Sequence, residues 1–287
     1  MTVGGQCQVC SGRVETYRHD WLSRCEQCRV LIADLPVAIP TVPDHAGLDE
    51  ALRFSGLEPL RLANNRRLVD VFARLAPAGA RLLDVGCGPG MLLSQARLSG
   101  YRVEGVEPDA NIVSVARDAQ VEVRHGYFPE ALAPDETFDI IVFNDVLEHI
   151  PDLRGALEAS ARHMAPGGVL CLNCPDQRGF YFRVAAVLDR LGVHGPYDRL
   201  WQRGMPSPHV WYFTPALLKR AAEAAGFQHV EDTRLATIEL RGLWDRIRYV
   251  DNTPRLLSLA TFVFAVVTYP ILALVPSDAT ACFFRRR

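Results

Sequence analysis

The chain has 287 residues, 31 basic against 33 acidic side chains, and an apolar fraction of 49%. This length and apolar content suit one large α/β domain with a small appendage. They exclude a wholly disordered, collagen-like or disulfide-stapled chain. The formal net charge of −2 lacks the basic excess of most nucleic-acid-binding domains, so we expect a partner other than nucleic acid.

Residues 1–35 contain two Cys-x2-Cys pairs, Cys7 with Cys10 and Cys25 with Cys28. The N-terminus lacks a charged segment followed by an apolar run, so we expect no signal peptide and a cytoplasmic protein. In that compartment clustered cysteines bind metal more often than they form disulfides. Four thiolates at this spacing predict a closed, tetrahedral and therefore structural zinc site of the ribbon type.

Residues 36–78 begin as a linker with Pro36, Pro40 and Pro43, and apolar spacing then predicts a helix over 49–75. From residue 79 to 287, strand and helix patterns alternate. The predicted strands are 81–85, 102–106, 121–124, 138–143 and 168–174, and the predicted helices are 91–99, 110–119 and 153–164. This alternation predicts a doubly wound, mostly parallel sheet with helices on both faces.

An aromatic-rich insertion at 177–213 follows the fifth strand. Its rings are Phe180, Tyr181, Phe182, Tyr197, Trp201, Trp211, Tyr212 and Phe213. Parallel sheets place substrate-covering segments at this end, which favours a cover. The alternative is that the rings form the core of an extra helical layer.

The segment 256–275 has no charged side chain and is long enough to cross a membrane. Pro270 interrupts it, and the strand-like segment 279–284 that follows belongs in the sheet. Four small side chains suit packing on another helix, namely Ser258, Thr261, Ala265 and Thr268. We therefore expect a buried or interfacial helix, while a peripheral membrane contact stays open because of the apolar segment and the arginines at 285–287.

The segment 82–90, LLDVGCGPG, runs from an apolar strand into a glycine-rich turn. Gly86, Gly88 and Gly90 let the backbone turn tightly and let a ligand approach it closely. A dinucleotide site usually has its third glycine one residue later, where this chain has Met91. Asp84 would repel a pyrophosphate but not a positively charged ligand.

The following strand ends carry further candidate ligand-binding groups. Glu107 ends the second strand in the sequence VEPD, where a carboxylate can accept both ribose hydroxyls of an adenosine. The alternative is an ordinary surface acid. Tyr127 and Phe128 end the third strand, where they can stack on an adenine ring.

The motifs DVGCGPG, VEPD, FDIIVFNDVLEHIPD and APGG stand in the order and spacing typical of one family. Over about residues 80–240 the chain resembles the class I S-adenosylmethionine-dependent methyltransferases, in the small-molecule branch of types 11, 12 and 23. The resemblance implies a Rossmann-like seven-stranded sheet with an antiparallel last hairpin, here 228–235 with 279–284. The segment between these strands is longer than the family needs, so we expect an added apolar helical insertion at 241–277.

The same resemblance implies S-adenosylmethionine as the cofactor. It assigns the turn residues to the methionine part, the strand ends to the ribose and adenine, and one amide to the floor of the site. These residues are Asp84, Gly86, Cys87, Gly88 and Gly90 for the methionine part, Glu107 and Pro108 for the ribose, Tyr127 and Phe128 for the adenine, and Asn144 for the floor.

Methyl transfer is an in-line displacement in which the cofactor carries the hard chemistry and the protein aligns the reactants. For a hydroxyl acceptor His149 is the candidate general base, and Glu148 could orient it. The alternative is that both residues only start a helix after the fourth strand.

Asp145, Glu148 and His149 also resemble the acid-x-x-Glu-His segment of metal-assisted O-methyltransferases. Those enzymes occur in ubiquinone pathways and in small-RNA 2′-O-methylation. His209, 60 residues after His149, is a candidate further ligand. A Mg²⁺ ion there would acidify a bound hydroxyl, although those groups usually have Glu at the position of Asp145.

We therefore expect an enzyme that methylates a small-molecule, sugar or glycan acceptor, preferably at oxygen. Two alternatives remain, an rRNA or tRNA methyltransferase that grips RNA with the zinc ribbon, and a catalytically silent cofactor-binding module. Residues 1–30 hold four arginines against three acids, a net charge of +1 that is poor for phosphate contacts. The intact glycine turn with Glu107 argues against the silent module.

Overall fold

The computed structural model describes residues 5–38, 50–118, 121–248 and 254–287, with the backbone alone for 50–55 and 117–118. Pro40, Pro43 and the predicted helix ends at 49 and 119 lie outside the described residues. Pro36 lies in an extended segment with no regular secondary structure, as the linker prediction requires.

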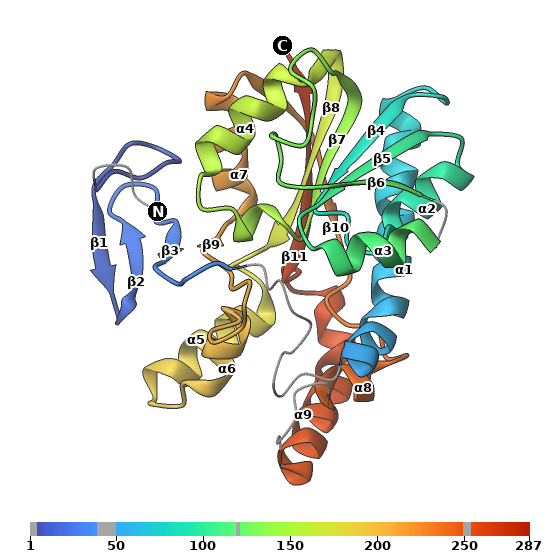
Figure 1. Cartoon of the computed structure of the whole chain (residues 1–287). Helices are drawn as coiled ribbons and strands as arrows, with labels where there is room; N and C mark the ends of the chain where they lie inside the picture. The colour runs from blue at the N-terminus through green and yellow to red at the C-terminus, as the bar shows by residue number, and fades with distance from the viewer. Residues whose placement is uncertain (1–4, 39–49, 119–120, 249–253) are drawn as a thin grey trace.

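A seven-stranded sheet forms the centre of the molecule (Figure 1). Its order is β10-β11-β8-β7-β4-β5-β6. The strands are β4 (Arg81–Val85), β5 (Arg102–Glu107), β6 (Glu122–His125), β7 (Phe138–Asn144), β8 (Met164–Pro175), β10 (Phe227–Arg234) and β11 (Ala279–Arg286). The first five pair in parallel, and β11 is antiparallel to both neighbours, which confirms the predicted doubly wound sheet and its last hairpin.

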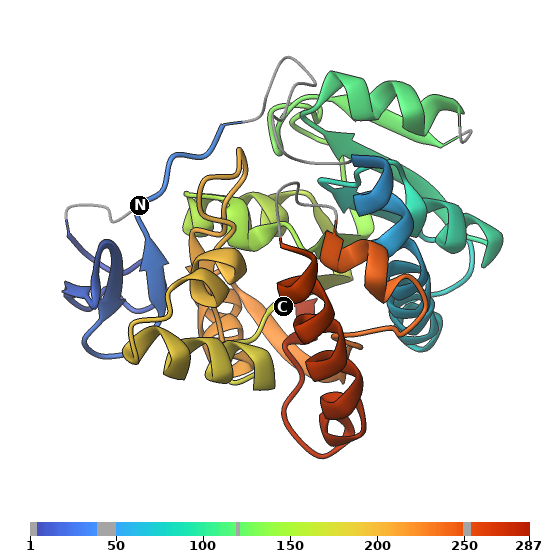
Figure 2. The same ribbon diagram turned by 90° about the horizontal axis from the view of Figure 1, so that it is seen from below.

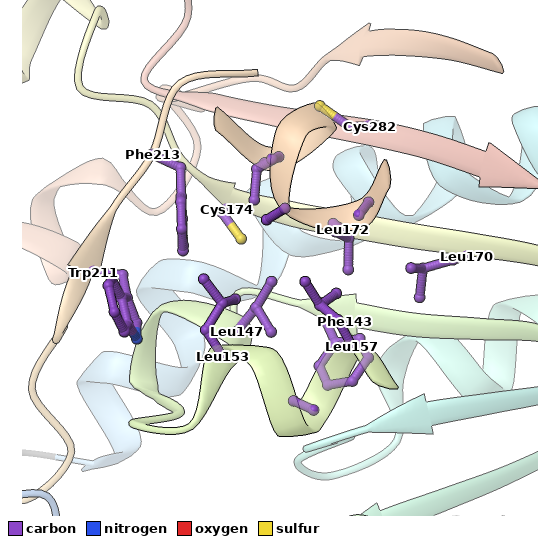
Figure 3. Packing of buried hydrophobic residues seen from close by; sticks show 14 of the residues in the cluster. Phe143, Leu147, Leu153, Leu157, Leu170, Leu172, Cys174, Trp211, Phe213 and Cys282 are labelled. Atoms are coloured by element: carbon purple, nitrogen blue, oxygen red, sulfur yellow. The ribbon is translucent and has the colours of Figure 1, made fainter. Parts of the chain in front are cut away.

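Helices cover both faces of this sheet. Buried side chains of α4 (Leu153–Arg162) and α7 (Pro215–Ala224) pack on one face, and those of α1 (Glu50–Leu75), α2 (Met91–Leu98) and α3 (Ala110–Asp118) pack on the other. Figure 3 shows the first face, where Leu153 and Leu157 of α4 lie against the sheet. Cys171 and Cys174 of β8 belong to opposite cores, because an offset of three residues reverses the side of a strand.

The largest boundary error of the sequence analysis lies between α4 and β8. The helix ends at Arg162 rather than 164, and β8 begins at Met164, four residues before the predicted start. Met164 pairs with Phe138, and the register then shifts so that Val169 pairs with Ile140. The residues Ala165–Gly168 form an irregular stretch within the strand, which a pattern search assigns to a loop.

The four-cysteine module is not a separate appendage. Its strands β1 (Val14–Tyr17), β2 (His19–Cys25) and β3 (Leu31–Ala33) form a second sheet with β9 (Trp211–Tyr212), which comes from the aromatic insertion. Buried side chains of the module, including Val9 and Ile32, join the same core as α4 and α7. The module therefore shares a sheet with the aromatic insertion and a core with the large α/β domain.

The aromatic insertion forms α5 (Phe180–Arg190), α6 (Gly195–Leu200) and β9. Phe182, Tyr197 and Trp201 are buried against Leu22 and Leu31 of the cysteine module. These rings are the core of an added helical layer, as the second interpretation expected.

The insertion between β10 and β11 forms α8 (Leu243–Arg248), α9 (Arg255–Thr268) and η2 (Tyr269–Ala273). α8 lies so close to α1 that a Cβ at Gly56 would stand 2.4 Å from the backbone nitrogen of Arg246. α9 extends away from the sheet, as Figures 1 and 2 show.

Of the two expectations for the apolar segment, a buried or an interfacial helix, the structure excludes burial for most of α9. Only three side chains of α9 are buried, Ser258, Ala265 and Thr268, while Thr261 of the small-residue stripe is exposed. Leu256 is 79% exposed and Leu274 is 87% exposed. By length and composition Arg255–Ala273 is a candidate membrane span within the described chain.

The C-terminal arginines do not accompany this helix. Arg285 donates to the carbonyl groups of Gly167 and Leu75, at 2.6 Å each, and Arg286 donates to that of Met164. The C-terminal end of β11 and helix α9 lie at opposite ends of the sheet's strands (Figure 1). The arginines at 285–287 therefore do not support a membrane contact of 256–275.

Candidate active site

The glycine-rich turn follows β4 and leads into α2. Gly86, Gly88 and Gly90 all have positive φ angles, 67°, 55° and 81°, which favour glycine. A Cβ at Gly86 would stand 2.7 Å from the Val146 side chain, so a larger residue does not fit there. No described atom lies within 4 Å of where a Cβ of Gly88 would stand, which leaves this backbone open to a ligand.

Glu107 is tied to the turn from the end of β5. Its carboxylate accepts hydrogen bonds from the backbone N–H groups of Gly88 and Asp109, each at 3.0 Å, and the residue is 7% exposed. Burial raises the pKa of Glu107, and the two backbone hydrogen bonds partly oppose that shift. The interpretation of Glu107 as an ordinary surface acid is therefore wrong.

Cys87 fills space inside the turn. It is buried, and a Cβ at Gly105 of β5 would stand 2.4 Å from the Cys87 sulfur. A glycine at 105 therefore makes room for the turn, a role that the sequence alone did not reveal. Pro108 follows Glu107, and its carbonyl group lies 3.1 Å from Nε2 of His125.

Asp84 is the last acid before the turn and is 2% exposed. Its Oδ1 atom has no hydrogen-bond partner among the described residues. Burial, and then the negative charge of Glu107, raise the pKa of Asp84 well above its usual range. A buried, unpaired carboxyl group beside an open backbone fits a ligand that carries a cationic amino group.

The two aromatic residues after β6 lie differently. Tyr127 is 59% exposed. The Phe128 ring is half-buried, with its centre 5.6 Å from that of Phe143 in an edge-on arrangement. Adenine stacking by either ring stays a prediction.

Asn144 belongs to a chain of amides at the carboxyl edge of the sheet. Its Nδ2 group donates to Oδ1 of Asn65 at 3.1 Å, and its Oδ1 accepts from Asn173 at 2.8 Å. Asn65 comes from α1 and Asn173 from β8, and both are buried. The sequence analysis missed both, since only the fold brings α1 to this edge.

Glu148, His149 and His209 lie together, and their ligand atoms are all within 4.8 Å of one another. Glu148 and His149 are in η1 (Leu147–His149), and His209 is in the segment before β9. The rings of His149 and His209 are 4.8 Å apart between centres, and Oε1 of Glu148 is 4.0 Å from Nε2 of His149. The two histidines are thus brought together as the sequence analysis expected.

Several atoms of this group lack partners among the described residues. Both carboxylate oxygens of Glu148 and Nδ1 of His209 are buried without one. Burial, and then the charge of Asp145, raise the pKa of Glu148 well above its usual range, and burial lowers that of His209 well below it. In His149, Nδ1 lies 2.9 Å from the Pro208 carbonyl oxygen, so Nδ1–H donates and Nε2 is left with its lone pair.

Asp145 does not join this cluster of ligand atoms. Its carboxylate accepts a hydrogen bond from Asn173 at 3.0 Å, and its backbone has a positive φ of 58°. The predicted set of Asp145, Glu148 and His149 is therefore wrong in its first member, because the backbone of Asp145 turns its side chain toward β8. His209 completes the set of three instead.

The segment that carries η1 is braced from two sides. The backbone N–H of Val210 donates to the Glu148 carbonyl at 2.7 Å, and the Trp211 indole donates to that of Ile150 at 2.8 Å. From the cysteine module, Gln8 donates to the Pro151 carbonyl at 2.9 Å and accepts from the Arg154 N–H at 3.0 Å. The module thus supports the chain that follows His149.

The four cysteines also converge. The sulfur atoms of Cys7 and Cys28 are 3.6 Å apart, those of Cys10 and Cys25 are 3.4 Å apart, and all four lie within 4.8 Å of one another. Four ligands at the usual Zn–S length give sulfur separations of about 3.8 Å in a tetrahedron. A hydrogen bond with Cys28 lowers the pKa of Cys7 to about 5. The donor set and its size therefore fit one zinc ion.

A family model described as a methyltransferase domain matches residues 60–232. The chain belongs to this methyltransferase domain family. It is an S-adenosylmethionine-dependent methyltransferase with the expected Rossmann-like fold, and the buried, unpaired Asp84 beside the open turn fits that cofactor.

Curated relatives match part of this chain. The ubiquinone biosynthesis O-methyltransferases of Xanthomonas oryzae pv. oryzae (strain PXO99A) and Xanthomonas campestris pv. campestris (strain B100) are 37% and 35% identical to it over 137 residues. Each match covers 45% of this chain and 57% of the relative. The similarity therefore spans little more than half of those enzymes.

Solved structures share its fold. Magnesium protoporphyrin IX methyltransferase from Synechocystis PCC 6803, with bound SAH, gives a TM-score of 0.54 at 14% identity and covers 81% of this chain and 86% of its own. The methyltransferase complex with the Haloferax volcanii Trm112 activator gives 0.56 at 18% identity, with 83% and 93% covered. At these identities the likeness concerns the fold alone.

Proposed function

We propose that this methyltransferase transfers a methyl group to a hydroxyl of a small-molecule, sugar or glycan acceptor. The observation that carries the proposal is the group of Glu148, His149 and His209 beside Asn144, at the sheet edge where the glycine turn lies. The named activity of the Xanthomonas relatives, O-methylation in ubiquinone biosynthesis, supports oxygen as the methylated atom.

His149 is the proposed general base. Because Nδ1–H donates to the Pro208 carbonyl, Nε2 of the neutral ring carries the lone pair that would accept the proton of the acceptor hydroxyl. Glu148, 4.0 Å from Nε2, would stabilise the imidazolium that forms. When bound, the cofactor supplies a methyl group on a positively charged sulfur, and Asp84 and Glu107 would hold and orient it.

A divalent cation at the same three residues is the second candidate, favoured by a specific observation. The Glu148 oxygens and Nδ1 of His209 have no partner within the described residues and lie in one group with His149, which makes a carboxylate and two-imidazole donor set. A Mg²⁺ or similar ion held there would lower the pKa of a bound hydroxyl. His149 would then be a ligand rather than the base.

A transfer assay distinguishes these two roles. We would incubate the protein with methyl-labelled cofactor and a panel of catechols, sugars and hydroxylated polyketides, with and without a chelator. Activity that survives chelation but is lost in His149→Ala supports the base. Activity that is lost on chelation and restored by Mg²⁺ supports the metal, and unchanged activity in His149→Ala contradicts both.

The zinc site is proposed for Cys7, Cys10, Cys25 and Cys28. The size of the sulfur cluster and its closed set of four protein ligands support a structural ion. Elemental analysis of purified protein should give one zinc per chain, falling to none in Cys10→Ser with Cys28→Ser. Protein that is fully folded without any metal would contradict this.

Peripheral membrane contact is proposed for α9. Its exposed apolar side chains, among them Leu256, Leu257, Val263 and Val267, support insertion at the interface. Co-sedimentation with phospholipid vesicles tests this, with Leu256→Gln/Val263→Gln against the exposed α2 control Leu98→Gln. Equal sedimentation of the two variants would exclude α9 as the contact.

A further inference from the structure

A cavity of about 410 Å³ lies between the cysteine module and α5. Figure 2 shows α5 alongside the module, on the side away from α8. Five of the twelve residues that line the cavity are arginines, and none of these lining residues is acidic. The arginines are Arg18, Arg24, Arg29, Arg183 and Arg190.

The chain builds this arrangement from two separate elements. Arg183, Ala186, Val187 and Arg190 are spaced three, four and seven residues apart, so they share one face of α5. The other face of α5 buries Ala185 and Asp189. The remaining three arginines come from the turn between β1 and β2, from β2, and from the loop before β3.

Two of the five arginines already have acidic partners. Arg18 donates to the buried carboxylate of Asp189, which also accepts from His194 at 2.7 Å and contacts His19 at 3.0 Å. Asp189 is thus satisfied by residues that hold the module to α5.

Arg24 is 3.3 Å from Glu15 and stacks on the Tyr17 ring, 4.0 Å from its centre. Its Nε–H is nevertheless buried, with no hydrogen-bond partner among the residues that the structure describes.

The other three arginines carry uncompensated charge. Arg29, Arg183 and Arg190 have no ion pair and no side-chain hydrogen bond within the described chain, and all three are exposed at the rim. Like charges gathered around one cavity repel one another, and that cost is relieved when an anion binds between them. Although the chain has a net charge of −2, the residues that line this cavity are basic without any acidic counterpart.

We infer that this cavity binds a ligand with a phosphate or diphosphate group, of about the size of a nucleoside diphosphate. Guanidinium groups match phosphate oxygens with paired N–H donors, and several around one cavity favour a multiply charged phosphate ester. The rings of Tyr17, Phe182 and Tyr197 also line the cavity and give an organic group apolar surface. None of the lining residues belongs to the glycine turn or to the Glu148, His149 and His209 group, so the site is a second one.

The test is calorimetric titration with uridine diphosphate and with inorganic pyrophosphate, while excess S-adenosylhomocysteine saturates the cofactor site. The variant is Arg183→Gln/Arg190→Gln. The matched control is Arg162→Gln/Arg220→Gln, which removes two exposed arginines from α4 and α7. Phosphatidic acid vesicles provide a separate arm, in which the phosphate comes from a lipid headgroup.

We expect binding with one site per chain that weakens as NaCl is raised. The cavity variant should bind at least about tenfold more weakly, and the control should stay within about twofold of wild type. Binding to vesicles alone, abolished only in the cavity variant, would assign the same site to a lipid phosphate.

Equal losses in both variants would overturn the inference. So would binding of neither phosphate source, or binding of single-stranded RNA without binding of the two small phosphates. Titration with S-adenosylhomocysteine alone checks that each variant is folded. It also keeps this inference apart from the proposed function, since protein that binds diphosphate but not S-adenosylhomocysteine contradicts only the latter.

Discussion

Asp84 and Glu107 are two buried carboxyl groups that interact electrostatically, and the pKa values of both are raised. Glu107 is compensated by two backbone N–H groups, whereas Asp84 has an oxygen without a partner in the described chain. Such an arrangement is costly when both groups are ionised and no cation is near. We therefore expect the protein to bind a cationic ligand here and to be stabilised by it.

The first prediction concerns the proton of Asp84. Its pKa in the free protein lies above its usual range, and a bound ammonium group lowers that pKa again, so binding releases a proton at low pH. Cofactor affinity should rise with pH until pH passes the raised pKa, and then level off. Calorimetry in two buffers with different ionisation enthalpies measures the released proton.

The matched variants are Asp84→Asn and the exposed Asp135→Asn. Asp84→Asn should bind at least about tenfold more weakly, because a charge-assisted hydrogen bond is lost, and without proton release. Proton release that persists in Asp84→Asn would show that another group titrates.

Among individual residues, the sequence predicted those that belong to a short continuous motif. The turn from Asp84 to Gly90 and the acid at 107 are recognisable because one strand and one turn define their chemistry. Asn65 and Asn173 could not be predicted, since they reach Asn144 only when α1 and β8 meet at the sheet edge. Asp145 was misassigned because a positive φ angle is not visible in sequence.

Among the elements, α1 and α8 make an unusually close contact at Gly56. The prediction is that Gly56→Val destabilises the protein by about 1–3 kcal/mol, because its side chain would overlap the α8 backbone. Valine has the better intrinsic helix propensity, so a loss of stability isolates the packing cost.

Urea unfolding measures this effect against Arg66→Val, an exposed position of α1. The control should change stability by less than about 0.5 kcal/mol. If Gly56→Val were as stable as this control, α8 would not pack closely against α1 in solution.

Strand patterns identified the five parallel strands of the large sheet, and the family resemblance supplied its antiparallel hairpin. They missed the second sheet, because β9 pairs with β3 from a distant part of the chain (Ile32 with Trp211) and is only two residues long. They also left open whether α9 is buried or interfacial, since its apolar composition is shared by buried helices and by membrane-contacting ones.

Across the whole molecule, the cysteine module and the catalytic domain act as one structure. Gln8 lies between Cys7 and Cys10 and bonds to both Pro151 and Arg154, just after His149. We predict that Gln8→Ala retains zinc but lowers turnover several-fold, since two hydrogen bonds of about 1 kcal/mol each no longer hold this segment.

The matched control is Gln6→Ala, an exposed residue of the same module. Zinc content and initial rates are measured on both proteins. Equal rates would mean that the module does not position the segment that carries His149.

The central claim is that the turn after β4, flanked by Asp84 and Glu107, binds S-adenosylmethionine. Its most direct test is calorimetric titration of the full chain with S-adenosylhomocysteine, comparing wild type with Glu107→Ala and with the exposed β6 control Glu122→Ala. The account predicts one site per chain, affinity at least about tenfold weaker in Glu107→Ala, and no change in the control. No binding to the folded wild-type protein, or undiminished binding to Glu107→Ala, would contradict it.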